Sequence, residues 1–344
     1  MLARLKEPFE ALRGENGAFI AALHKDYHTC YLRDHLYATF AYFFLEEHDK
    51  FRQGMWLTFD IFHKHRQRIK RIIEHPPKNG HEFLHAKYDP ETLGEIEPFF
   101  GHHQLDALGL FLFIVGFAEQ NGLPLVRKNA DKAMLNLLVL YVRAVEYCKR
   151  GDNGMWQGEM ALHSSSVGAV LSGLVELKAA KLVKVRNPLI ANGITALDAL
   201  VLEEPPGLAQ LSLIWPYDIV TPAVRNEILS KVSKKLVEKH GLNRYFGDEY
   251  YRSRATGISA QWPLGFFWLS IIKSELGDTK DARLWFERGA AQITPAGIPK
   301  LYTDDTPNDH VPLAWAHALA IIAYTKLQNK AAPKDNNHSE DATS

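Results

Sequence analysis

The run Leu108-Gly109-Leu110-Phe111-Leu112-Phe113-Ile114-Val115-Gly116-Phe117-Ala118 lies between Asp106 and Glu119 and is the most apolar stretch of the chain. It is far shorter than the roughly 20 residues that a membrane-spanning helix needs. A helix that is apolar on every side must be buried on every side, whereas an amphipathic helix covers others from outside. The stretch therefore predicts a helix at the centre of the fold.

Helical segments of these two kinds alternate along the whole chain, and β-type alternation is scarce. The amphipathic, charged segments span about 3–24, 50–74, 130–149, 188–204, 223–239 and 279–291. The apolar segments span about 33–46, 103–119, 163–177, 208–220, 260–275 and 312–327. This alternation predicts an all-α fold, an (α/α)6 toroid with six inner and six outer helices. The segment 208–220 fits least well because Pro205, Pro206 and Pro216 interrupt it.

The bulk composition is that of a globular protein, with 46% hydrophobic and 23% charged residues. A net charge of zero gives no reason to expect a nucleic acid or an anionic membrane as a partner. Two cysteines, Cys30 and Cys148, cannot form a disulfide framework, so we expect a cytoplasmic protein. No change in composition divides residues 1–330, which we interpret as one domain. The polar residues 331–344 predict a disordered tail.

Polar and aromatic residues gather where the apolar segments begin. Because all inner helices of such a toroid run in the same direction, these groups should meet at one mouth. Rings that stack on sugar C–H faces, together with forked donors and carboxylates, are what a sugar site needs. The candidates are Arg33, Asp34, Gln104, Asp106, Trp156, Gln157, Glu159, Arg244, Tyr250, Trp262, Lys300, Asp304, Asp305 and Trp315.

Each candidate alone has a structural explanation. The pair Arg33-Asp34 could be a helix-start ion pair, and a single Trp is most often a core residue. The pairs His102-His103 and His63-Lys64-His65 lack the i,i+4 spacing that places two ligands on one helix face, so we expect no metal. No glycine-rich phosphate loop is visible and no cofactor is expected. The joint location of the clusters is what favours a sugar site.

Several stretches together resemble glycoside hydrolase family 15, the glucoamylase-like (α/α)6 toroids. The resemblance is strongest to the N-terminal domains of phosphorylase kinase α and β regulatory subunits. It covers about residues 30 to 325 in the family's order. The stretches are Tyr31-Leu32-Arg33-Asp34-His35-Leu36-Tyr37, Leu84-His85-Ala86-Lys87-Tyr88, Gly101-His102-His103-Gln104-Leu105-Asp106-Ala107, Gly154-Met155-Trp156, Leu162-His163-Ser164-Ser165-Ser166-Val167-Gly168, Gly241-Leu242-Asn243-Arg244-Tyr245, Pro299-Lys300-Leu301-Tyr302 and Pro312-Leu313-Ala314-Trp315.

The resemblance implies roles for individual residues. In glucoamylase-like enzymes, the pair matching Arg33-Asp34 binds the terminal glucose, and the arginine matching Arg244 lines the same subsite. An inverting mechanism uses a carboxylic acid directly after the tryptophan that matches Trp156. Its base is a glutamate two residues before a tyrosine in the last loop.

Both catalytic positions differ in this chain. The acid position holds Gln157, which cannot transfer a proton at a useful pKa. The base position holds Lys300, a cation with an ordinary pKa of about 10.4.

Three functions remain open at this point. The chain could bind an α-glucan or oligosaccharide with little or no hydrolysis. It could instead be an active inverting hydrolase that uses Glu159 with Asp304 or Asp305, which requires carboxyl groups roughly 6.5–9.5 Å apart. It could also be a regulatory or scaffold domain with a protein partner, as the phosphorylase kinase resemblance allows.

Overall fold

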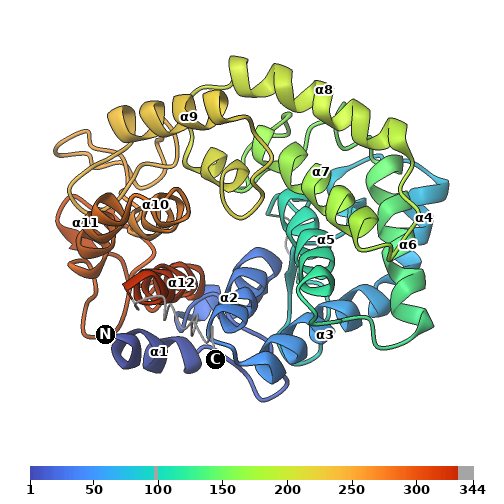
Figure 1. Ribbon diagram of the computed structural model, residues 1–344, viewed down its shortest axis with the longest axis horizontal. Helices are drawn as coiled ribbons and strands as arrows, with labels where there is room; N and C mark the ends of the chain where they lie inside the picture. The colour runs from blue at the N-terminus through green and yellow to red at the C-terminus, as the bar shows by residue number, and fades with distance from the viewer. Residues whose placement is uncertain (97–99, 332–344) are drawn as a thin grey trace, which may run out of the picture.

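Six helical segments form a closed inner ring in the computed structural model, which describes residues 1–96 and 100–331 (Figure 1). Each segment contacts the next, and the last contacts the first. In chain order they are α2 (Leu32–Phe44), α5 (Leu105–Gln120), α7 (Ser164–Ala179), the 3-10 helix η3 (Leu208–Leu213), α10 (Leu264–Glu275) and α12 (Ala314–Ala331). The predicted all-α toroid is confirmed.

The remaining long helices surround this ring (Figure 1). They are α1 (Leu2–Glu10), α3 (His48–Lys64), α4 (Arg66–Glu74), α6 (Asn129–Ala144), α8 (Asn187–Glu203), α9 (Pro222–Lys235) and α11 (Thr279–Ala290). The helix α11 shows how an outer helix packs, since it buries Ala282 and Phe286 and leaves charged residues such as Arg283 and Glu287 exposed.

Glycines allow the inner helices α5 and α7 to approach closely. A Cβ atom on Gly109 would lie 2.4 Å from the backbone carbon of Ala169, and one on Gly173 would lie 2.7 Å from Leu112 Cβ. Any larger side chain at these positions would force the two helices apart, and overpacking a core costs typically 1–3 kcal/mol or more. The apolar run of α5 is buried almost throughout, as its sequence predicts.

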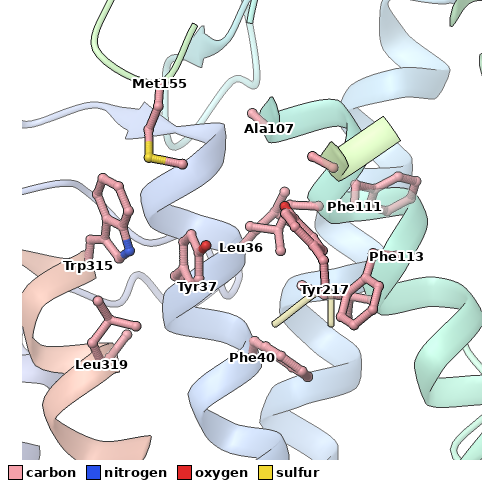
Figure 2. Packing of buried hydrophobic residues seen from close by; sticks show 14 of the residues in the cluster. Leu36, Tyr37, Phe40, Ala107, Phe111, Phe113, Met155, Tyr217, Trp315 and Leu319 are labelled. Carbon is pink, nitrogen blue, oxygen red and sulfur yellow. The ribbon is translucent and has the colours of Figure 1, made fainter. Parts of the chain in front are cut away.

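Aromatic side chains fill the centre of the ring below its mouth (Figure 2). Tyr37 and Phe40 project from α2 toward Trp315 of α12 and Phe113 of α5. The ring planes of Tyr37 and Trp315 stack with their centroids 5.2 Å apart. The toroid is therefore a packed core with a floor and not an open channel.

Three predicted helices differ from the structure. The segment 3–24 is helical only to Glu10, since Gly14 and Gly17 follow and Gly17 has φ +93°. The segment 50–74 is two helices that meet at His65. The fourth inner segment, predicted over 208–220, is only the short 3-10 helix η3. A longer helix cannot run through Pro216, because proline has no N–H to donate.

Short elements complete the fold. The strand β1 (Cys30–Tyr31) pairs antiparallel with β2 (Lys87–Tyr88), and β3 (Tyr302–Thr303) pairs antiparallel with β4 (Thr306–Pro307). Two further 3-10 turns, η1 (Lys25–Tyr27) and η2 (Gly80–Glu82), lie in loops. Among the helices described, none is long and apolar enough to cross a membrane. The predicted disordered tail lies outside the described residues from 332 onward.

Candidate functional site

A cavity of about 330 Å³ lies at the end of the toroid where the inner helices begin. Arg33 and Asp34 reach it from the first turn of α2, and Trp315 from the first turn of α12. The loops that precede α7 and α10 supply most of the rest. Its lining residues are Tyr27, Tyr31, Arg33, Asp34, Phe100, Met155, Trp156, Gln157, Gly158, Arg244, Tyr245, Tyr250, Trp262, Lys300, Leu313 and Trp315.

Three tryptophans form one wall of the cavity. The ring of Trp156 lies 5.3 Å from that of Trp262 and 5.8 Å from that of Trp315, measured between centroids. The indole N–H groups of Trp262 and Trp315 are buried and have no hydrogen-bond partner in the described part of the chain. Buried donors are normally paired with protein, water or ligand. The wall therefore combines stacking surface with donors that a ligand or water can satisfy.

The guanidinium of Arg33 is fixed from behind. It donates from Nε to Asp106 Oδ2 at 2.5 Å and from Nη2 to Asp106 Oδ1 at 3.0 Å. Nη2 also donates to Gln104 Oε1 at 2.7 Å. This forked pairing holds Arg33 in one orientation in a buried place, where a free guanidinium would be costly.

A second buried arginine is held in the same way. Arg244 donates from Nε and Nη2 to the two carboxylate oxygens of Asp248, at 2.7 and 2.8 Å. Its guanidinium carbon lies 4.4 Å from the ring centroid of Tyr250 and 5.6 Å from that of Trp262. Because both arginines are pre-oriented, a ligand would not have to order them on binding.

Asp34 and Lys300 are cavity-wall groups whose pKa values are shifted toward neutral pH. Burial raises the pKa of Asp34 to about 6, although the neighbouring charges of Arg33 and Lys300 oppose this rise. Burial, with help from Arg244, lowers the pKa of Lys300 to about 7, against the attraction of Asp34. Lys300 Nζ donates to the hydroxyl of Tyr250 at 2.8 Å and also to that of Tyr27. The two groups thus titrate near neutral pH in one cavity.

The loop before α7, which contains Trp156 and Gln157, is held in place by the buried carboxylate of Asp152. Asp152 Oδ2 accepts from the backbone N–H of Leu105, at the start of α5, and from Ser166 Oγ of α7, both at 2.8 Å. The loop then turns through Gly154 with φ +60° and Gln157 with φ +58°. This path places Trp156 and Gln157 against the cavity.

Not all of the predicted site residues line this cavity. Gln104 and Asp106 lie behind Arg33 and position it. Glu159 lines a neighbouring cavity of about 450 Å³, which shares Trp156, Arg244 and Tyr245 with the first. The predicted residues that line the first cavity, of about 330 Å³, are Arg33, Asp34, Trp156, Gln157, Arg244, Tyr250, Trp262, Lys300 and Trp315.

Asp304 and Asp305 do not line the cavity. Asp304 accepts from Ser253 Oγ at 2.6 Å and Thr256 Oγ1 at 2.5 Å, and these hydroxyls lower its pKa. Asp305 accepts from Lys239 Nζ and is largely exposed. Asp34 is the sole carboxylate among the lining residues that the structure describes.

Sequence reasoning missed several residues that line or support the site. Tyr27 is the largest omission, because it precedes the first apolar helix by a loop and a strand and carries no motif. Asp248 belongs to the polar group that precedes the fifth apolar segment, and its ion pair with Arg244, four residues before it, was not predicted. Met155 and Tyr245, also in the wall, stand next to predicted residues and could have been included.

Comparison of the sequence with known proteins gives weak but extended similarity. No protein-family model matches the chain. A probable phosphorylase b kinase regulatory subunit alpha from Caenorhabditis elegans is 23% identical over 300 residues, 70% of this chain and 24% of that protein. The skeletal muscle isoform from Mus musculus is 30% identical over 313 residues, 73% of this chain and 25% of that protein. The chain thus spans about a quarter of the length of these relatives.

Comparison of structures gives the fold. A glycosidase variant in complex with glucose superposes with a TM-score of 0.78 and 18% identity, covering 95% of this chain and 98% of that one. A bacterial glucoamylase complexed with acarbose gives a TM-score of 0.64 and 14% identity, covering 94% of this chain and 55% of that one. The chain has the glucoamylase-like (α/α)6 fold, and its sequence is similar to phosphorylase kinase α regulatory subunits.

Proposed function

We propose that the chain binds the end of an α-glucan or oligosaccharide in the cavity at the mouth of the toroid, with little or no hydrolysis. The single observation that carries this proposal is the carboxylate content of the cavity. An inverting hydrolase needs two carboxyl groups roughly 6.5–9.5 Å apart. Among the described lining residues, Asp34 alone supplies one.

The other polar groups of the cavity support binding. Asp34 and Arg33 offer a carboxylate and a forked cation at the start of α2, and the three tryptophans offer stacking faces. The structural neighbours in complex with glucose and acarbose support a sugar as the ligand class. A fold does not by itself imply a function, so the cavity residues are the main support for a sugar ligand.

The groups at the two catalytic positions support a loss of hydrolysis. Gln157 lines the cavity but has no proton to give at a useful pKa. Lys300 lines it as an amine with a pKa of about 7, so it is partly neutral at pH 7. A neutral lysine could accept a proton, but without an acid for the leaving group the pair is incomplete. General acid–base groups contribute about 10²–10⁴-fold each.

Calorimetric titration with maltose, maltotriose and lactose tests the binding. We expect saturable heat with the α-linked sugars and none with lactose. The Asp34→Asn variant removes the carboxylate and should weaken binding about 100-fold, whereas Asp305→Asn, on an exposed residue outside the cavity, should leave the affinity unchanged. Absence of binding at 10 mM for every gluco-oligosaccharide would refute the proposal.

A hydrolase that uses Glu159 is the second candidate, because this carboxylate lines the cavity adjacent to the first. It predicts release of glucose from maltotetraose that disappears in Glu159→Gln. Glucose release by the unaltered chain at the same rate as by Glu159→Gln would exclude Glu159 as the acid. Any release above a buffer blank would show that the chain is an active hydrolase.

A regulatory role is consistent with the relatives' names, and in that case the sugar would act as a signal for a protein partner. We also propose that the protein is located in the cytoplasm. Cys30 and Cys148 are free thiols, which supports a reducing compartment.

A further inference from the structure

A second group of polar side chains lies beside the cavity, where two distant parts of the chain meet. His24 immediately precedes η1, and Asp309 and His310 follow β4. One ligand atom from each of the three lies within 4.8 Å of those from the others. His24 Nε2 is 3.4 Å from Asp309 Oδ2, and His310 Nε2 is 3.9 Å from Asp309 Oδ1. The two imidazole rings meet edge to face, with centroids 4.9 Å apart.

We propose that His24, Asp309 and His310 bind a divalent transition-metal ion of the Zn²⁺ type. Imidazole nitrogen and carboxylate oxygen are ligands that zinc accepts, at about 2.0–2.2 Å from the metal. In a tetrahedral site, ligand atoms at that distance stand roughly 3.3–3.5 Å from one another. The distance between His24 Nε2 and Asp309 Oδ2, 3.4 Å, already lies in this range. The carboxylate of Asp309 is 73% exposed, so it can rotate to close the longer separation to His310.

The other ring nitrogens have partners suited to an outer shell. A histidine that binds metal through Nε2 usually donates its Nδ1–H to a carboxylate, a carbonyl or water. His24 Nδ1 lies 3.7 Å from Asp26 Oδ2. His310 Nδ1 lies 3.0 Å from the side-chain amide of Asn308, which can present its oxygen by turning over. The backbone N–H of Asp26 also donates to His24 Nδ1, at 3.3 Å. Binding of a metal through Nε2 therefore requires that each imidazole carries its proton on Nδ1, where a turned Asp26 carboxylate and the side-chain oxygen of Asn308 would accept it.

The local charges fit a dication. Asp309 and Asp26 supply two negative charges, and protonated imidazoles are not needed for neutrality once a metal is bound. The opposing charge is Lys300, whose backbone N–H donates to the carbonyl of His310 at 3.0 Å and whose ammonium contacts Tyr27. Three protein ligands leave at least one position open for water or a hydroxyl group.

The site has a structural consequence because of where its ligands come from. His24 belongs to the segment before α2, and His310 to the segment before α12, so a metal would link two neighbours in the inner ring. The ring of Tyr27, part of the cavity wall, packs on His310 with centroids 4.2 Å apart. Spacing rules that look for nearby ligand pairs could not find this cluster, since its halves lie at opposite ends of the sequence.

The test uses the full chain without a histidine tag, freed of metal by dialysis against a chelator and titrated with ZnCl₂ by calorimetry. We expect one Zn²⁺ per chain with micromolar or tighter affinity. His24→Ala and His310→Ala should each weaken binding at least about 100-fold. Asp26→Asn, which alters only the outer shell, should weaken it about 10–100-fold. His28→Gln changes an exposed histidine of the same loop and is the matched control.

A second measurement identifies the ligands directly. Co²⁺ in place of Zn²⁺ should give the intense visible absorption of a four-coordinate site, and His310→Ala should remove it. Circular dichroism of each metal-free variant checks that the fold is intact. Zn²⁺ affinity weaker than about 1 mM, or affinity unchanged in His24→Ala and His310→Ala, would overturn the proposal.

Discussion

The two ends of the toroid carry cavities of similar size and different chemistry. At the end where the inner helices begin, a cavity of about 330 Å³ combines three tryptophans with charged groups that are buried. At the end where they finish, a cavity of about 380 Å³ is lined by aromatic rings, among them Phe40, Phe117 and Trp215. Its charged lining residues are Asp218, Arg225, Glu275 and Lys326, and Lys326 pairs with Glu275.

The two ends share aromatic surface and differ in how their charged groups are held. The buried arginines of the first end are each held by a carboxylate that does not face the cavity. At the other end Lys326 has a partner that is 47% exposed. An exposed ion pair is worth little, whereas a buried, pre-oriented one is costly to build and fixes geometry. The proposed ligand site is the one at the first end, and four predictions test this proposal.

Loss of the carboxylate behind Arg33 should have the largest effect. Asp106→Asn leaves the guanidinium buried without its charged partner and should lower the free energy of unfolding by about 3–5 kcal/mol. Urea denaturation followed by circular dichroism measures it. Asp305→Asn, on an exposed residue, should change the free energy of unfolding by less than about 0.5 kcal/mol. Equal effects of the two substitutions would remove the distinction between buried and exposed pairs.

Asp34→Asn should separate binding from stability. Loss of charged hydrogen bonds to sugar hydroxyls should weaken maltose binding about 100-fold. The pKa of Asp34 is higher in the folded chain, at about 6, than in an unfolded one. Ionised Asp34 therefore destabilises the fold increasingly as pH rises from about 4 to about 6. At pH 7 the variant should be more stable than the unaltered chain, by about 1–3 kcal/mol. A variant that binds poorly and is also less stable would contradict this account.

Sugar affinity should fall as the pH is lowered through the pKa of Asp34. With a pKa of about 6, the ionised fraction of Asp34 drops about tenfold between pH 7 and pH 5. Maltose affinity should drop by a similar factor. The charged fraction of Lys300 changes only about twofold over this interval. Calorimetry at pH 5, 6 and 7 measures the trend, and Asp34→Asn should flatten it. Affinity that rises toward pH 5 would exclude ionised Asp34 as the acceptor.

Changes at the opposite end of the toroid should have the smallest effect. Lys326→Met breaks the rim pair with Glu275, and it should alter the free energy of unfolding by less than about 1 kcal/mol. Maltose affinity should remain within twofold of the unaltered value. A larger loss of affinity would indicate that the end at Phe40 and Trp215 takes part in binding.

The polarity of the segments was enough to predict the toroid. Helices such as α5 are apolar on every side because other elements cover every side, and this pattern can be recognised in a single sequence. Two of the three predicted helices that differ from the structure end near a glycine or a proline, and the third, 50–74, is divided at His65. The glycine is Gly17 and the proline is Pro216. How far such a break extends depends on tertiary packing, which local patterns do not report.

The site was predictable only in part, for a geometric reason. A residue at the first turn of an inner helix, such as Asp34 or Trp315, has its direction set by the helix, so its place at the mouth follows from the fold. Loop residues do not have this constraint. Asp304 is only four residues after Lys300, which lines the cavity. Asp304 itself has φ +49° and accepts a hydrogen bond from Ser253 outside the cavity. Tyr27 enters the cavity from a loop that no pattern marked.

The contact between α12 and α2 closes the ring, and this determines when the ring can form during translation. During synthesis α2 is available early, but its neighbour α12 begins only at Ala314. Until that helix has left the ribosome, the ring is open on one side and Trp315 is missing from the cavity wall. A nascent chain therefore exposes an apolar face of α2 through most of translation, which is a condition that favours chaperone binding. The proposed sugar site is therefore complete only in the finished ring.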